Sequence, residues 1–350
     1  MAILTELRSA AVLVPGSLAT RTGGYIYDAH IVDGLRARGW RVAVREVAAG
    51  GFSAALASLP AGCITLVDGL LYGAAPEVVE AHASQVRFVP VIHLPLAEDI
   101  GLDQPARQRL EASERRALRF AARVVATGPA TAVTLETYGV PRASIVLALP
   151  GTDAAALAHG TGSPLQILCV ATVNAGKGHA MLIRGVASAP TRDWHLTCAG
   201  SLSWDPAAVV EVRDLVAQEG LQAHVTFPGE LDSAALERLY ASADLFALAT
   251  LKETFGMAIA EAIAHGLPVV STLTGAVTTV AGESAGVFVE PGNEAAFTHA
   301  LHRLMTDAPE RARVAAQARE SRHRLPTWDH CLDKISTALD ELSISGQPSL

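Results

Sequence analysis

The stretch LFALATLKETFGMAIAEAIAHGLPVV, residues 245–270, contains in order the signals of a strand, a loop, a helix, a turn and a second strand. Its first apolar run has the length of a buried strand. The Ala- and Ile-rich segment after Gly256 holds good helix formers, and Gly266 with Pro268 ends this helix before a β-branched run. The stretch therefore predicts a crossover between two parallel strands.

Two carboxylates, Glu253 and Glu261, lie on either side of the start of this helix. A carboxylate in the loop can reach a ligand, and one in the first turns of the helix can point along the same cleft. Gly256 allows close approach of the backbone, and the first free N–H groups of a helix bind anions. We interpret the stretch as an anionic-ligand site; the alternative is an ordinary crossover whose acids are solvated.

The same strand–helix rhythm extends over the rest of the chain and restarts after a Gly-, Ala- and Ser-rich linker at 150–164. A length of 350 residues suggests two domains. We expect an α/β protein with parallel sheets. The predicted strands are 10–14, 41–47, 63–67, 87–92, 123–126, 165–171, 195–199, 225–228 and 286–289, and the predicted helices include 25–38, 105–125 and 326–342.

Composition indicates which partners, cellular location and cysteine chemistry to expect. Half of the residues are hydrophobic and the net charge is −8, so nucleic acid is not the expected partner. No apolar run has the length of a membrane span, and no basic stretch with a cleavage motif stands at the N-terminus, so we expect a cytoplasmic protein. The four cysteines, Cys63, Cys169, Cys198 and Cys331, are far apart, which favours buried reduced thiols over disulfides or a metal site.

Other candidate ligand residues follow predicted strands, where open α/β sheets bind their ligands. These are the pair Gly23 and Gly24, His93, Lys177 between two glycines, and Gly200. Neither the dinucleotide fingerprint nor the Walker A pattern fits these loops. Each feature has an ordinary alternative, namely a turn, a structural histidine or a solvated lysine.

The Glu-x7-Glu pattern, with Phe255-Gly256-Met257 after the first glutamate and Gly266-Leu267-Pro268-Val269 after the helix, resembles the signature of the family 4 retaining glycosyltransferases. His93 and Lys177 match that family's donor-sugar histidine and diphosphate lysine. The resemblance extends over nearly the whole chain and implies a GT-B-like fold, two Rossmann-like parallel-sheet domains facing a central cleft. It implies an acceptor-side domain at 1–155, a nucleotide-sugar donor domain at 156–325, and a terminal helix at 326–350 that packs back on the first domain.

The resemblance also implies roles for individual residues. Lys177 and the amides around Gly256 and Met257 would bind the diphosphate, Glu261 the ribose hydroxyls, and Glu253 and His93 the donor sugar. The expected catalytic residues are His93, Lys177 and Glu253. The expected donor-binding residues are Gly23, Gly24, Gly200, Thr254, Phe255, Gly256, Met257 and Glu261.

The implied reaction moves a hexosyl group from a nucleoside-diphosphate sugar to an acceptor hydroxyl with retention of configuration, without a metal or a separate cofactor. A lipid, a glycan or a small molecule could be the acceptor. The family commonly has an arginine shortly before the lysine, where this chain has Thr172, Asn174 and Gly176. Two alternatives therefore stay open: a catalytically silent nucleotide-sugar-binding or scaffold protein, and a nucleotide-sugar epimerase of the same fold.

Arginines recur along the predicted helix at 105–125, with Arg109, Arg116 and Arg123 at heptad spacing. Such a basic face could contact anionic lipid, which would place the protein at the inner face of the membrane. The alternative is a solvated helix face with local ion pairs, since Glu111 and Glu114 interrupt the basic residues.

Overall fold

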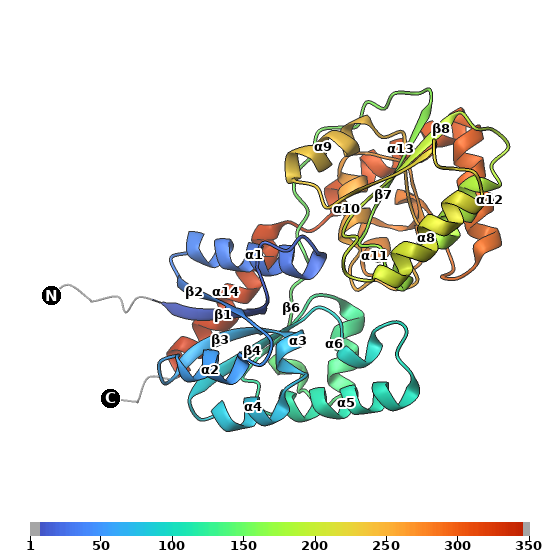
Figure 1. Ribbon diagram of the computed structural model, residues 1–350. Helices are drawn as coiled ribbons and strands as arrows, with labels where there is room; N and C mark the ends of the chain where they lie inside the picture. Colours follow the sequence, from blue (N-terminus) through green and yellow to red (C-terminus); the bar gives the residue numbers. More distant parts are fainter. Residues whose placement is uncertain (1–7, 346–350) are drawn as a thin grey trace. The chain divides into compact units, whose positions relative to one another are not determined.

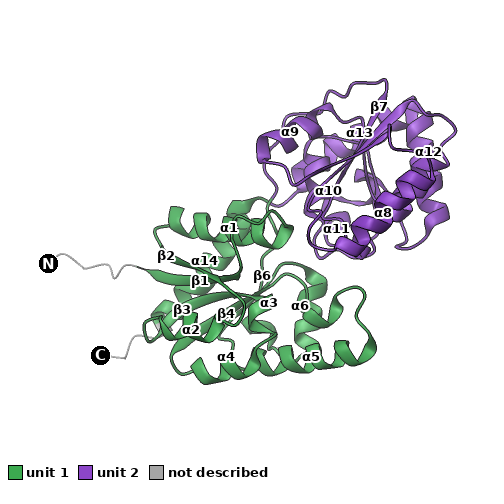
Figure 2. Cartoon of the chain, in the orientation of Figure 1, with its two compact units in different colours: residues 1–151, 327–350 green, residues 152–326 purple. Residues whose placement is uncertain are grey.

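The computed structural model describes residues 8–345. The chain folds into two compact units (Figure 2). Unit 1 takes its residues from both ends of the described chain, up to Gly151 and from Thr327 onward, and unit 2 comprises residues 152–326. The first division lies a few residues before the boundary that we predicted at 155.

Unit 1 is built on a six-stranded sheet with the strand order β2-β1-β3-β4-β5-β6, and all of its pairings are parallel (Figure 1). The strands are β1 Ser9–Pro15, β2 Arg41–Val47, β3 Cys63–Asp68, β4 Val86–Ile92, β5 Val124–Ala126 and β6 Ile145–Leu147. The helices are α1 Gly23–Ala37, α2 Phe52–Ala57, α3 Gly69–Tyr72, α4 Pro76–His82, α5 Gln104–Leu118, α6 Pro129–Thr137 and α14 Trp328–Ser345, with short 3-10 turns η1 Leu96–Glu98 and η2 Arg142–Ser144.

Two apolar cores lie on the two faces of this sheet. One core joins the sheet to α1 and α14, and the other joins it to α2, α4, α5 and α6. The side of β1 that packs on α1 carries Ala10, Val12 and Val14, whereas Ala11 and Leu13 belong to the opposite core. This alternation follows from the two-residue period of a strand, and a strand that is buried on both faces has the continuous apolar sequence seen here.

Unit 2 is built on a second parallel six-stranded sheet, with the order β12-β11-β10-β7-β8-β9. The strands are β7 Leu165–Val170, β8 Trp194–Ala199, β9 Val225–Gly229, β10 Leu245–Leu248, β11 Val269–Thr272 and β12 Val287–Val289. The helices are α7 His179–Ala187, α8 Pro206–Gln218, α9 Ser233–Ser242, α10 Met257–Ala264, α11 Val277–Ala281, α12 Glu294–Thr306 and α13 Ala308–Ser321, with 3-10 turns η3 Ala175–Lys177, η4 Glu283–Ala285 and η5 Arg322–Arg324.

Both sheets have a topological switch point, where consecutive connections leave in opposite directions. In unit 2 the chain runs from β7 outward through β8 and β9, and then returns to place β10 on the other side of β7. In unit 1 the switch lies between β1 and β3. Ligands of open α/β sheets bind beyond the carboxyl ends of the strands at such points.

Two predicted helix boundaries were wrong. The helix α1 begins at Gly23 rather than Tyr25, so the glycine pair forms its first turn instead of a loop. The helix predicted at 105–125 ends at Leu118, because the chain must then enter the sheet: the Ala122 N–H donates to the Phe88 carbonyl at 2.9 Å, and β5 follows.

Among the described residues, no helix has the length and apolar character required to cross a membrane.

Candidate functional site

The loops that leave β7 and β10 at the switch point of unit 2 contain most of the predicted site residues. The Thr250 hydroxyl and the Leu251 N–H both donate to the Gly176 carbonyl, at 3.3 and 2.8 Å. These bonds fasten the two loops together. The residues of the two loops, which are far apart in sequence, therefore form one site.

The Lys177 turn is shaped by Asn174 and Gly178. The Asn174 side chain accepts hydrogen bonds from the Gly176 and Lys177 N–H groups at 2.9 and 3.1 Å. Gly178 has a positive φ of 65°, and a Cβ at this position would overlap the carbonyl oxygen of Ala249. Only glycine meets both conditions. The glycine after the lysine thus brings the two loops into contact.

Lys177 and Glu253 form an ion pair between these loops, with 2.6 Å from Nζ to Oε1. Their side chains are 26% and 14% exposed, so the pair is partly shielded but accessible from solvent. When a ligand binds here, the ammonium can pair with an anionic group of the ligand, and the carboxylate can accept a hydrogen bond from a ligand hydroxyl.

The first turn of α10 lies at the end of the same β10 loop. The N-cap residue that precedes it, Gly256, has a φ of 97° and offers no side chain to the helix amides. By contrast, four other helices of unit 2 are capped by side chains, α8 by Asp205, α9 by Asp232, α12 by Asn293 and α13 by Asp307. The amides of α10 are therefore left for an anion, and the helix dipole favours negative charge there.

Glu261, one turn into α10, is oriented by a buried tyrosine. The Tyr240 hydroxyl donates to Glu261 Oε2 at 2.8 Å, and its ring stacks on His265 at 4.6 Å between centroids. Burial raises the pKa of Glu261, while the hydrogen bond from Tyr240 and the nearby His265 oppose that rise. This carboxylate is therefore held in one direction and desolvated, which suits recognition of ligand hydroxyl groups.

The remaining predicted residues of unit 2 contribute through their backbone. The Phe255 ring is 3% exposed, and the carbonyls of Thr254 and Phe255 accept from Ala276 and Val277 at 3.1 and 2.9 Å. Met257 is half-buried at the start of α10. A Cβ on Gly200 would overlap the Ala171 carbonyl, so this glycine allows the loops after β7 and β8 to approach each other.

In unit 1, His93 lies at the end of β4, near the switch point. Its Nε2 is 3.2 Å from Asp28 Oδ1 and 3.8 Å from Asp68 Oδ2, and both aspartates are buried. A Cβ on Gly24 would approach the His93 ring at 3.2 Å, so this glycine leaves room for the ring. Gly23 is exposed beside it in the first turn of α1.

The histidine and the two aspartates form a coupled electrostatic group. Burial by itself lowers the pKa of His93, but attraction to Asp28, the hydrogen bond with it and attraction to Asp68 together raise the pKa. Burial is also the largest cause that raises the pKa of Asp68 to about 6, against the opposing charge of His93. The His93 ring is therefore kept in place and biased toward its protonated form.

The C-terminal half of the chain matches a known family. Residues 158–321 match the model of the glycosyl transferases group 1. The matched stretch contains the Lys177 turn, both glutamates and the Tyr240 contact described above. This part of the chain is therefore similar to the group 1 glycosyltransferases.

Curated relatives are similar to this chain over parts of their length. The chain is 36% identical over 125 residues to a D-inositol 3-phosphate glycosyltransferase of Stackebrandtia nassauensis, which covers 35% of this chain and 28% of that protein. It is 32% identical over 201 residues to the protein of the same name from Xylanimonas cellulosilytica, covering 56% of this chain and 46% of the relative. The chain thus spans about half or less of the length of these relatives.

Solved structures are similar over nearly the whole chain. The sucrose-phosphate synthase of Thermosynechococcus elongatus has a TM-score of 0.79 at 20% identity, covering 97% of this chain and all of that one. Anabaena HepE in complex with UDP-glucose has a TM-score of 0.75 at 16% identity, covering 95% and 99%. These likenesses confirm the predicted two-domain GT-B fold.

Asp68 was expected only as a loop residue after a strand, and Asp28 and Tyr240 were not predicted from the sequence at all. Tyr240, Asp28 and Asp68 orient predicted site residues, but each lies inside or at the end of an ordinary helix or strand pattern. Asp68 had a usable signal, since it directly follows the strand predicted at 63–67. Asp28 and Tyr240 could be found only from the packing of their helices.

The arginines of α5 are largely engaged within the protein. Arg116 pairs with Glu77 and Glu80 at 2.5 and 2.6 Å, and Arg107 donates to three backbone carbonyls. Arg123 lies beyond the end of the helix and pairs with Glu341 of α14 at 3.3 Å. This pattern favours the interpretation as a helix face with local ion pairs, so we do not carry the membrane contact into the proposed function.

Two groups of potential metal ligands occur among the described residues, each with its ligand atoms within 4.8 Å of one another. In the group of Asp28, Asp68 and His93, the short contact is the 3.2 Å hydrogen bond between His93 and Asp28. The second group is Cys169, His179 and Cys198, in the core of unit 2. All four cysteines are free thiols and three are buried. The hydrogen bond from Cys198 lowers the pKa of Cys169, whereas burial opposes this effect.

Proposed function

We propose that the protein transfers a hexosyl group from a nucleoside-diphosphate sugar to an acceptor hydroxyl, with retention of anomeric configuration. The observation that carries the proposal is the 2.6 Å pair between Lys177 and Glu253, placed beside the uncapped start of α10 at the switch point of unit 2. It offers a cation, a row of amides and a carboxylate to one ligand.

In the proposed complex the ligand diphosphate replaces Glu253 as the ion-pair partner of Lys177. It also accepts hydrogen bonds from the backbone amides of Gly256 and Met257. Cleavage of the bond between sugar and phosphate leaves negative charge on the diphosphate, which an ammonium and a helix N-terminus stabilise as it develops. Glu253, once released, can accept from the sugar hydroxyls. Glu261 can accept from the ribose hydroxyls in the direction that Tyr240 fixes.

We propose that this chemistry needs no metal, because positive charge for the leaving group comes from Lys177 and from α10. The described loops at 172–178 and 249–256 contain a single acidic residue, Glu253, rather than a pair of carboxylates that could hold a magnesium ion. Turnover that persists in excess EDTA is expected, and a requirement for added magnesium or manganese would contradict it.

The similar proteins suggest the first substrates to test. HepE has been solved with UDP and with UDP-glucose, and the curated relatives above are named for D-inositol 3-phosphate. A thermal-shift panel of UDP-, GDP- and ADP-sugars should therefore begin with UDP-glucose. Inositol phosphates should be among the first acceptors, beside lipid and glycan acceptors, and NMR of the product would report its anomeric configuration.

Replacement of Lys177 is the decisive test. Lys177→Ala removes the cation that pairs with Glu253, so we expect kcat to fall by about 100-fold or more. Lys177→Arg, which keeps the charge, should retain part of the activity. Arg184→Ala is the matched control, because it removes a cation from α7 that pairs with Glu294 instead. Full activity in the Lys177→Ala variant would refute the assignment.

A silent nucleotide-sugar-binding protein is the second candidate, and one observation favours it. The residues from 171 to 178 contain no arginine. The Asn174 side-chain oxygen already accepts hydrogen bonds from the Gly176 and Lys177 N–H groups of the turn. A lost bidentate phosphate contact costs on the order of 1.5–3 kcal/mol. Stabilisation by a sugar nucleotide, without release of nucleotide in hydrolysis and acceptor screens, would support this candidate over transfer.

A further inference from the structure

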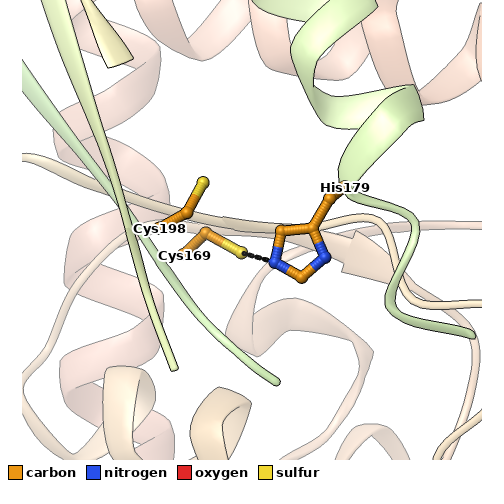
Figure 3. A group of neighbouring side chains, drawn as sticks. All are labelled: Cys169, His179 and Cys198. Carbon is orange, nitrogen blue, oxygen red and sulfur yellow. Dashed lines mark hydrogen bonds between the residues drawn. The ribbon is translucent and has the colours of Figure 1, made fainter. Parts of the chain in front are cut away.

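In the core of unit 2, next to the Lys177 turn, three side chains of types that commonly bind metals lie close together. Cys169 lies on β7 and Cys198 directly opposite it on β8, and His179 is the first residue of α7. Their exposed fractions are 0%, 1% and 2%. Figure 3 shows the edge of the His179 ring facing the Cys169 sulfur, with Cys198 alongside.

The spacing of these atoms suits a shared ion better than a direct hydrogen bond. Cys169 Sγ and His179 Nε2 are 3.9 Å apart, and both lie within 4.8 Å of Cys198 Sγ. A sulfur at about 2.3 Å and a nitrogen at about 2.0–2.1 Å from one ion, at tetrahedral or trigonal angles, are roughly 3.6–3.8 Å apart. Cys169 and His179 therefore need to approach each other only slightly, and Cys198 Sγ, which lies within 4.8 Å of both atoms, would complete the coordination by moving toward them.

The buried imidazole also lacks other polar partners. His179 Nδ1 is buried and makes no hydrogen bond within the described chain, so the long contact from Nε2 to a thiol is the ring's one polar interaction. Burial of a polar ring is costly unless it is paired. A bond from Nε2 to an ion would replace this weak thiol contact with a stronger one, while Nδ1 would keep its proton and its position without a partner.

We propose that Cys169, His179 and Cys198 form a binding site for one thiophilic d10 cation, Zn(II) or Cu(I). Thiolate and imidazole ligands select these ions over magnesium or calcium. Binding forms two sulfur–metal bonds and one nitrogen–metal bond, and the two thiols release their protons to solvent. No electron is transferred, so the step requires no oxidant.

The two ions are distinguished by coordination number. Structural zinc sites almost always have four ligands, whereas the described residues offer three within reach. A three-ligand site in a dry core is therefore expected to retain Cu(I) more firmly than Zn(II). Either ion would tie the start of α7 to the middle of the sheet.

The test begins with the purified full chain, kept reduced with a phosphine and incubated separately with Zn(II) and, without oxygen, with Cu(I). After desalting, elemental analysis should find one ion per chain for at least one of the metals, and the loaded chain should melt at a higher temperature. Cys198→Ser and His179→Gln should abolish both effects. Cys63→Ser, which removes a thiol from unit 1, is the matched control and should bind like the unaltered chain.

A measurement on the unaltered chain guards against variants that fold poorly. Added Co(II) should give an intense thiolate-to-cobalt charge-transfer band that saturates at one equivalent, and excess Zn(II) or Cu(I) should remove it. Failure of the unaltered chain to retain any of the three metals would overturn the proposal. Equal loss of binding in Cys63→Ser and Cys198→Ser would do the same. Neither readout depends on transferase activity.

Discussion

At the residue scale, the orientation of Glu261 depends on one hydroxyl. The Tyr240 O–H donates to Glu261 Oε2 at 2.8 Å within a buried setting. Because the proposed ribose contact requires that carboxylate in a fixed direction, Tyr240→Phe should weaken nucleotide binding about 3- to 10-fold, the range of one buried hydrogen bond. Titration calorimetry with the nucleoside diphosphate would measure the change.

Two comparisons make this prediction specific. Glu261→Ala should weaken nucleotide binding more than Tyr240→Phe does, since it removes the contact itself. Tyr72→Phe removes another buried tyrosine hydrogen bond, to the Ala117 carbonyl in unit 1, and should leave nucleotide affinity unchanged. Equal losses in the Tyr72 and Tyr240 variants would mean that general destabilisation, not orientation of Glu261, is responsible.

His93 is the second case in which a neighbour controls a predicted site residue. Asp28→Asn removes the largest influence that raises the pKa of His93, while the burial that lowers it stays. We therefore expect the pKa of His93 to fall in this variant, as followed by NMR titration of the imidazole and assigned with His93→Gln. Asp33→Asn, an exposed change on the same helix, should leave the pKa of His93 unchanged.

The direction of the accompanying stability change follows from the raised pKa of His93. Because the pKa of His93 is raised in the folded chain, protonated His93 stabilises the fold, and this contribution is complete at pH values below the ordinary histidine pKa of about 6.5. The contribution is lost as pH rises through the pKa of His93 in the folded chain. The Asp28→Asn variant should lose that part of the pH dependence. An unchanged imidazole titration would show that Asp28 does not hold the ring in solution.

At the scale of elements, the role of α5 differs from the one suggested by its sequence. Its arginines suggested a surface function, yet the residue with the clearest electrostatic consequence is Glu114, which is buried and accepts from the Leu96 N–H at 3.1 Å. The other carboxylate oxygen, Oε1, has no partner within the described chain. Burial is the main cause that raises the pKa of Glu114 to about 7.

This raised pKa predicts a pH-dependent cost. Between about pH 4.5 and 7 the folded chain binds a proton at Glu114 that the unfolded chain has lost, so stability falls as pH rises through that window. Glu114→Gln should remove this slope and stabilise unit 1 at pH 8 by on the order of 2–3 kcal/mol. Hydrogen exchange of peptides from α5 and η1 would report it, and an advantage that persists unchanged at pH 4.5 would argue against a titrating carboxylate.

Elements were predictable from sequence where periodicity is strong. The apolar runs that became β1, β3, β4 and β7 have the nearly continuous hydrophobicity of strands buried on both faces. The short helices α2 and α4 were missed, because segments of six or seven residues depend on packing rather than on propensity. The same limit misplaced the end of α5, which is set by the entry of β5 into the sheet.

At the scale of the whole molecule, the order of strands decides which residues meet, and periodicity does not reveal that order. Lys177 and Glu253 could be predicted as one site only because a family pattern joins them. The group of His93, Asp28 and Asp68, and the opposition of Cys169 and Cys198, depend on which strands and helices are neighbours. For this reason the wide spacing of the cysteines and the apolar runs around three of them favoured buried reduced thiols over a metal site.

The return of the chain to unit 1 through α14 is the last feature set at this scale. Gly34 of α1 faces Leu332 of α14, and a Cβ at Gly34 would overlap the leucine side chain, which is 5% exposed. Alanine is intrinsically better than glycine in a helix by about 1 kcal/mol, but overpacking a closed core costs about 1–3 kcal/mol. Because the added Cβ would overlap both methyl groups and the Cγ of this buried leucine, we expect the clash to prevail and Gly34→Ala to destabilise unit 1.

A double-mutant cycle tests whether this packing is the cause. Leu332→Ala alone should cost about 2–5 kcal/mol through the cavity it leaves, and the added methyl of Gly34→Ala would fill part of that cavity. The double variant should therefore be more stable than the sum of the single changes predicts, by at least about 0.5 kcal/mol. Hydrogen exchange of α1 and β1 peptides follows unit 1 alone. Strict additivity would mean that α14 does not pack on α1 through this pair.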